Sequence, residues 1–151
     1  MHRRRAAPAG DAPWLCHIKI KREYDAHGHP LHEVPPEQTF CTITNKEHIA
    51  ICVTAAQASL LNPGATAQEE GGALAFVPSG LGGGGGAPPR HSDAFGRLGG
   101  GDYELEFTSN SVVLEIQGAE ADLTIVDLPG IIQSHPKGEH YVGMIKEMVV
   151  R

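Results

Sequence analysis

The chain has 151 residues, of which 19 are glycine and 11 are proline, and its formal net charge is −6. This length is that of one ordinary domain, and the negative charge argues against nucleic acid as a partner. The glycine excess is local, because residues 62–102 hold 13 of the 19 glycines. The composition therefore excludes a collagen-like chain and a chain that is disordered throughout.

The three cysteines, Cys16, Cys41 and Cys52, stand among apolar residues and form no C-x-x-C pair. The odd count, and a basic start that no hydrophobic leader follows, favour reduced, buried thiols in a cytoplasmic protein. No apolar run approaches the roughly 18 residues that a membrane span requires.

Residues 1–13 are expected to form an irregular arm. Apolar and polar residues then alternate over residues 15–24, with Cys16, Ile18 and Ile20 on one face, which predicts a half-buried strand. Residues 25–38 carry three prolines and predict turns. Residues 40–43 form a second, short strand candidate.

A helix of about 15 residues is predicted next, with Thr44 as its N-cap and Glu47 completing a capping box. Asn62-Pro63-Gly64 is expected to end it. Apolar residues follow one another at spacings of three and four and predict a single buried stripe. The stripe consists of Ile49, Cys52, Val53, Ala56 and Leu60.

Residues 63–102 include five consecutive glycines (82–86) and predict a disordered, low-complexity insert, because so little apolar surface cannot offset the entropy of ordering. The alternative is a glycine-rich loop that cradles phosphate. That chemistry requires a Gly-Lys-Ser or Gly-Lys-Thr end, and the sequence contains no Gly-Lys pair. The acidic pairs Glu69-Glu70 and Glu104/Glu106 are expected to be solvated.

Residues 111–117 and 123–127 are both predicted strands, and the short link between them allows an antiparallel hairpin. The second strand is a continuous apolar run that ends in Asp127. Such a run is typical of a strand covered on both faces in an α/β sheet. Farther along, apolar residues at helical spacing predict a helix over residues 141–150.

Three histidines, His27, His29 and His32, form an H-x-H-x-x-H pattern within the predicted turns. Imidazoles at this spacing, completed by Asp25 or Glu33, offer a weak site for Zn²⁺ or Ni²⁺. A structural zinc site normally adds thiolates, and no cysteine is near in the sequence. Solvated turn histidines are the favoured interpretation.

The segment that carries chemistry is Asp127-Leu128-Pro129-Gly130. A carboxylate at the carboxyl end of a buried parallel strand lies at the crevice where α/β folds bind ligands. A glycine just beyond it lets a backbone N–H approach a phosphate with no Cβ in the way. The pattern predicts a nucleotide site; the alternative is a strand followed by a Pro-Gly turn.

Three stretches, in order, resemble the GTPase domain of fungal dynamin-family large GTPases. They are similar to the strand after switch 1, to the following helix and to the strand pair that leads into switch 2. The resemblance implies an α/β fold with an incomplete P-loop GTPase-type sheet, formed by residues 14–62 and 103–150 around the insert. The stretches are PWLCHIKIKREYD, ITNKEHIAICVTAAQASLLNP and FTSNSVVLEIQGAEADLTIVDLPGIIQS.

The resemblance also implies roles for single residues in an intact parent protein. Asp127 would hold Mg²⁺ through water, and Gly130 would offer its amide to the γ-phosphate of GTP. Leu128, Pro129 and Ile131 would shape switch 2. GTP, other dynamin-like subunits, membranes and the cytoskeleton are the partners that the family implies. The location implied is the cytoplasm, with peripheral attachment to membranes.

The departures from the family pattern are large. The Gly-x-x-x-x-Gly-Lys-Ser loop, expected before residue 13, is absent, and the first threonine is Thr39, too late for switch 1. The guanine-reading motif is absent as well, since Asn45-Lys46-Glu47-His48 has histidine where aspartate is required. We therefore expect this chain to be inactive by itself. A degenerate, non-catalytic interaction module is the alternative.

The family also places the strand that feeds the phosphate loop beside the strand at residues 123–127. Because the sequence lacks that partner, we expect this strand to expose an apolar edge and the chain to be marginally stable.

Overall fold

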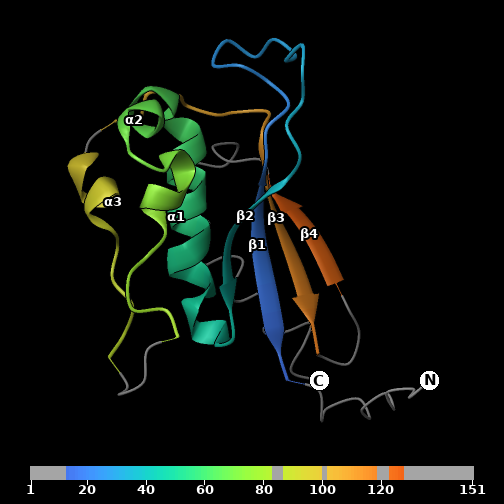
Figure 1. The fold of residues 1–151 in the computed structure, drawn as a ribbon, viewed down its shortest axis with the longest axis vertical. Helices are drawn as coiled ribbons and strands as arrows, with labels where there is room; N and C mark the ends of the chain where they lie inside the picture. Colours follow the sequence, from blue (N-terminus) through green and yellow to red (C-terminus); the bar gives the residue numbers. More distant parts are fainter. Residues whose placement is uncertain (1–12, 83–86, 100–101, 119–122, 128–151) are drawn as a thin grey trace.

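The computed structural model describes residues 13–82, 87–99, 102–118 and 123–127, which form a sheet with a layer of helices against it (Figure 1). This is a mixed α/β architecture. The elements are β1 (Leu15–Lys21), β2 (Gln38–Ile43), the 3₁₀ helix η1 (Lys46–His48), α1 (Ile49–Leu61), α2 (Pro63–Gln68), the 3₁₀ helix η2 (Gly72–Phe76), α3 (Asp93–Arg97), β3 (Ser111–Gln117) and β4 (Leu123–Asp127).

The sheet has the strand order β2-β1-β3-β4, and every neighbouring pair is antiparallel. The hairpin predicted from the short link between β3 and β4 is confirmed. Gly118 follows β3 with a φ of +82°, and a Cβ there would collide with the backbone of Pro13. Glycine is therefore required where the end of β3 passes the start of β1.

The alternation predicted for β1 is confirmed, since Cys16, Ile18 and Ile20 are buried and the residues between them are partly exposed. On the opposite face, the Lys19 ammonium lies 2.9 Å from the Glu115 carboxylate on β3. The apolar face packs against α1 and the polar face carries charge, as expected for a sheet covered on one side.

The start of the first helical segment differs from the prediction. Asn45, rather than Thr44, is the cap, and its side-chain oxygen accepts a hydrogen bond from the Glu47 backbone N–H at 2.9 Å. The chain then makes the single 3₁₀ turn η1 before α1 begins at Ile49. A capping box centred on Thr44 is wrong by one residue, because asparagine is at least as good a cap as threonine.

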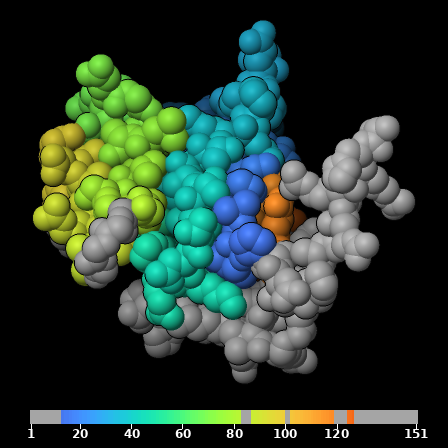
Figure 2. Space-filling model, turned by 60° about the horizontal axis from the view of Figure 1, so that its bottom comes forward, coloured from blue at the N-terminus to red at the C-terminus, as the bar shows by residue number. Residues whose placement is uncertain are grey.

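Helix α1 is buried on all sides, not along a single stripe. The five residues of the predicted stripe are buried, and so are Ala55, Ala58, Ser59 and Leu61 on the rest of its surface. One side meets the sheet, and the others meet α2, η2 and α3. In the space-filling view the residues of the insert lie as a continuous mass against those of β2 and α1 (Figure 2).

The expectation that residues 63–102 are disordered is wrong for their described part, which contains α2, η2 and α3. Ala73, Phe76 and Ala94 from this segment are buried in the same core as β1, β3 and α1. The Thr66 hydroxyl donates to the Ser59 carbonyl oxygen at 2.7 Å and joins α2 to α1. The short apolar run around Phe76 supplies buried apolar surface. The average composition of residues 63–102 does not reveal this run, because glycine dominates it.

Strand β4 is not covered on both faces, contrary to the prediction. It pairs only with β3 among the described strands and is outermost in the sheet. Ile125 packs against the core, whereas the Val126 side chain is 59% exposed. Within the described residues no strand pairs with the outer side of β4, so the open edge expected from the sequence is present there.

Replacing Phe76 by alanine tests whether the insert is part of the core. Its side chain is fully buried, so we expect Phe76→Ala to lower the free energy of unfolding by about 3–5 kcal/mol. Leu74, in the same 3₁₀ helix, is 43% exposed, and Leu74→Ala should cost no more than about 1 kcal/mol. Urea unfolding of both variants measures the difference; equal effects would contradict the packing described.

Candidate functional site

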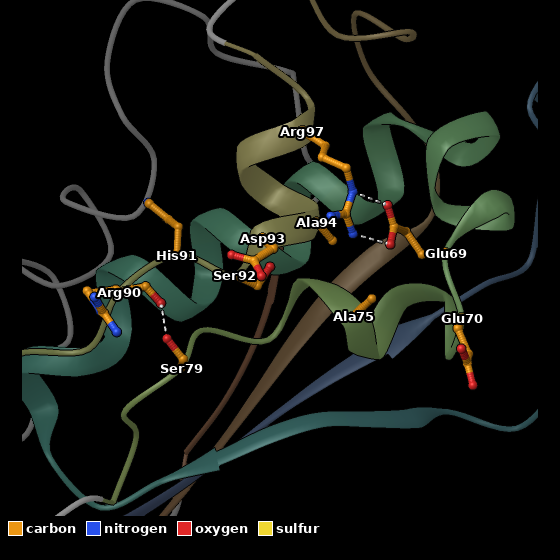
Figure 3. A pocket seen from close by; sticks show the side chains of 10 residues that line it. All are labelled: Glu69, Glu70, Ala75, Ser79, Arg90, His91, Ser92, Asp93, Ala94 and Arg97. Carbon is orange, nitrogen blue, oxygen red and sulfur yellow. Dashed lines mark hydrogen bonds and ion pairs between the residues drawn. The ribbon is translucent and has the colours of Figure 1, made fainter.

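A cavity of about 640 Å³ lies within the insert, between the end of α2, η2 and α3 (Figure 3). Its lining is mixed in charge and contains no lysine. The lining residues are Glu69, Glu70, Ala75, Ser79, Arg90, His91, Ser92, Asp93, Ala94 and Arg97. This segment contains the glycine run that a phosphate cradle would require, so its chemistry bears on that alternative.

An ion pair between Arg97 and Glu69 lies at one end of the cavity (Figure 3). The guanidinium donates from Nη2 to Oε1 at 2.6 Å and from Nε to Oε2 at 3.0 Å, which is the two-point geometry typical of arginine and carboxylate (Figure 3). The hydrogen bond from Arg97 holds the pKa of Glu69 below its ordinary 4.5. The expectation that Glu69 is merely solvated is therefore wrong.

Two further contacts shape the cavity. Ser79 and Arg90 exchange backbone hydrogen bonds of 2.8 and 2.9 Å, which brings together the two chain segments that flank the glycine run. The His91 ring stacks on Phe95 with the centroids 3.8 Å apart. Burial lowers the pKa of His91 below its ordinary 6.5, which favours the neutral imidazole.

The cavity does not have the chemistry of a phosphate site. The Arg97 guanidinium is already paired with Glu69, and the carboxylates of Glu70 and Asp93 add negative charge to the lining. In Figure 3 the Arg90 side chain lies at the opposite end of the cavity from Arg97, so the two cations do not converge. The contacts instead brace α2 against α3. Glycines 83–86 themselves lie outside the described residues.

Asp127, the predicted magnesium ligand, is the last residue of β4 and lies opposite Val112 in the register with β3. Leu128, Pro129 and Gly130 lie outside the described residues, as does the helix predicted over residues 141–150. Within the part of the chain that the structure describes, no three histidine, cysteine, aspartate or glutamate side chains are grouped to hold a metal ion.

The described histidines in the turn after β1 are likewise not part of such a group. There the Asp25 carboxylate accepts backbone N–H bonds from His27 at 2.8 Å and His29 at 2.9 Å, which lower its pKa. The His29 and Asp25 side chains lie 3.7 Å apart, and the imidazole is largely exposed. The interpretation as solvated turn residues fits this geometry.

Glu104 has a structural role that sequence analysis missed. Its carboxylate accepts hydrogen bonds from the backbone N–H groups of Gly64 at 2.7 Å and Ala65 at 2.8 Å, at the first turn of α2. A negative charge is stabilising there, because those donors have no partner within the helix. The two segments are about 40 positions apart, and no local pattern signals a contact over that separation.

No family model matches this chain, and neither does any curated protein or solved structure. None of the described helices combines the length and the apolar character needed to cross a membrane.

The Glu69–Arg97 pair predicts an acid-sensitive contribution to stability. The folded-state pKa of Glu69 is below 4.5, so the contribution is present above pH 4.5 and is lost as the pH falls through the folded-state pKa. In urea unfolding at a series of pH values, Glu69→Gln should lose less stability than the wild type on acidification. Glu70→Gln is the matched control and should keep the wild-type slope; equal slopes for all three proteins would refute the assignment.

Proposed function

We propose that this chain is part of a dynamin-type GTPase domain. The observation that supports this most is the position of β4, a strand that ends in Asp127, forms an antiparallel hairpin with β3 and is outermost among the described strands. The family to which the sequence is similar has the strand that feeds its phosphate loop beside this one. In an intact parent, such a strand would pair with the outer edge of β4, which no described strand occupies.

In the intact parent protein, GTP and Mg²⁺ would bind beyond the end of β4. A carboxylate such as Asp127 suits Mg²⁺, which prefers oxygen ligands. Among the described residues, no three histidine, cysteine, aspartate or glutamate side chains are grouped to hold a metal ion there. The described residues therefore do not fit a complete magnesium site.

The chain itself is proposed to be inactive. Phosphoryl transfer depends on positioning the phosphates and neutralising their charge. The sequence has no Gly-Lys-Ser loop to hold the phosphates, no switch 1 threonine and no motif that reads guanine. One carboxylate cannot replace these groups.

Incubating the purified chain with GTP and Mg²⁺ tests its inactivity. We expect phosphate release at the rate of the protein-free control, and the same rate for Asp127→Ala. Magnesium-dependent release that Asp127→Ala abolishes would contradict the inactivity of the chain.

Membership in the family has a separate test, which is to sequence full-length transcripts of the gene that encodes the chain. A Gly-x-x-x-x-Gly-Lys-Ser motif upstream of residue 13 and a Thr/Asn-Lys-x-Asp motif downstream, in one reading frame, are expected. Transcripts with neither motif would refute the GTPase parent.

The second candidate is a non-catalytic interaction module, a degenerate GTPase fold that binds other dynamin-like subunits. The specific observation in its favour is the outer position of β4, because an edge strand presents backbone groups that can pair with a strand of another chain. Transcripts that lack both motifs, together with capture of a dynamin-like subunit by the purified chain, would favour this candidate.

A further inference from the structure

A second cavity, of about 270 Å³, lies where the chain leaving β1 meets α1, α2 and η2. Its wall is largely apolar and includes Leu60, Pro63, Ala67 and Ala73, and Arg22 is the one charged residue among those that line it. Small-molecule sites are typically apolar cavities with a few polar groups, with volumes from about 300 Å³ upwards. The cavity is close to the lower end of that range, so its size and composition suit a small ligand.

Arg22 brings a positive charge to this cavity. It directly follows β1 and continues the alternation of that strand, in which Ile18 and Ile20 face α1. The Arg22 residue is partly buried, and no carboxylate of the described residues forms an ion pair with it. Burial lowers its pKa below the ordinary value, but a guanidinium keeps its proton in proteins. Because a partly buried charge without a counter-charge is costly, an anion in the cavity would be stabilising.

The hydroxyl groups in the lining already donate to the protein itself. Ser59 donates to the Ala56 carbonyl oxygen at 2.7 Å, and Thr66 donates to the Ser59 carbonyl oxygen at 2.7 Å. Both side chains belong to buried residues. The guanidinium is therefore the main donor that the lining offers to a ligand.

Asn110 fixes the chain next to Arg22. Its Oδ1 accepts hydrogen bonds from the backbone N–H groups of Glu23 at 2.7 Å and Tyr24 at 2.9 Å, and its Nδ2 donates to the Tyr24 carbonyl oxygen at 3.0 Å. Asn110 is itself buried and lines the cavity. The backbone that follows Arg22 is thus held in place before a ligand binds, which lowers the entropic cost of binding.

We propose that this cavity binds a small organic acid, whose carboxylate pairs with Arg22 and whose short hydrocarbon group lies against the apolar wall. A guanidinium suits a carboxylate because both are planar and can form two parallel hydrogen bonds. Inorganic phosphate has no apolar part and requires several donors, so one guanidinium in an apolar wall is a poor match for it. The proposal does not depend on a GTPase parent, since no residue of the segment 127–130 lines this cavity.

The test is to titrate the isotope-labelled whole chain with acetate, butyrate and hexanoate and to follow its backbone amides by NMR. We expect saturable shifts at Arg22, Ala67 and Ala73. Each CH₂ group that becomes buried should lower the Kd about fourfold until the apolar wall is covered. Hexanol, which lacks the charge, should bind at least about tenfold more weakly than hexanoate, and inorganic phosphate should leave these amides unshifted.

Variants locate the site. Arg22→Gln should raise the Kd for hexanoate at least about tenfold, because the carboxylate loses its partner. Lys21→Gln is the matched control: it removes the same charge from the neighbouring position, which faces away from α1 by the alternation of β1, and it should keep the wild-type Kd. Ala67 is exposed, so Ala67→Leu should fill part of the cavity without disturbing the core and weaken hexanoate binding while Arg22 is retained.

Urea unfolding of each variant checks that it folds, and Ala67→Leu decides the outcome if Arg22→Gln does not. The proposal would be overturned by equal Kd values for hexanoate in the wild type and in the folded variants of Arg22 or Ala67. Equal Kd values for acetate and hexanoate, phosphate binding as tight as that of hexanoate, or the absence of any saturable shift with hexanoate would overturn it as well.

Discussion

Helix α1 has almost no surface that can face water, and the rest of the fold is arranged around that requirement. Ten of its 13 residues are buried, on all sides of the helix. A sheet covers only one side of a helix, so the other sides need a second layer. Residues 63–99 provide it through α2, η2 and α3, and small residues such as Ala55 and Ala58 allow both layers to approach closely. The described part of the glycine-rich segment is therefore part of the core and not an appendage to it.

The polar groups at the end of α1 are buried too, and each of them has a hydrogen-bond partner. The buried Asn62 amide donates to the Ala58 carbonyl oxygen at 2.8 Å, and its own oxygen accepts from the Glu104 backbone N–H at 3.0 Å. The Leu105 N–H donates to the Leu61 carbonyl oxygen at 2.9 Å. Buried backbone groups are costly when unpaired, so these bonds hold the segment before β3 against the helix and connect the insert, α1 and the sheet.

Periodicity in the sequence predicted β1 and the burial of five residues of α1, though not the burial of its other sides. The short link between two apolar runs predicted the β3–β4 hairpin. All of these are local features of the sequence. The role of the insert could not be predicted in this way, because its apolar residues around Phe76 and Ala94 are few. They contribute to stability only by packing in the same core as α1, which is a contact between distant parts of the sequence. The partners Glu69 and Arg97 are 28 positions apart, and no local signal joins them. At the candidate site, the motif at residues 127–130 predicts a nucleotide site from residue types alone. The structure contributes the position of Asp127 at the end of an outer strand.

The central claim is that the insert and the sheet form one cooperative unit around α1, and amide hydrogen exchange of the whole chain tests it most directly. Segments that open only with the whole molecule share its slow exchange. We predict that the hydrogen-bonded amides of α1 and η2 exchange as slowly as those of β1 and β3. Exchange over residues 72–76 at the rate of an unstructured peptide, with β1 and β3 still protected, would contradict the claim.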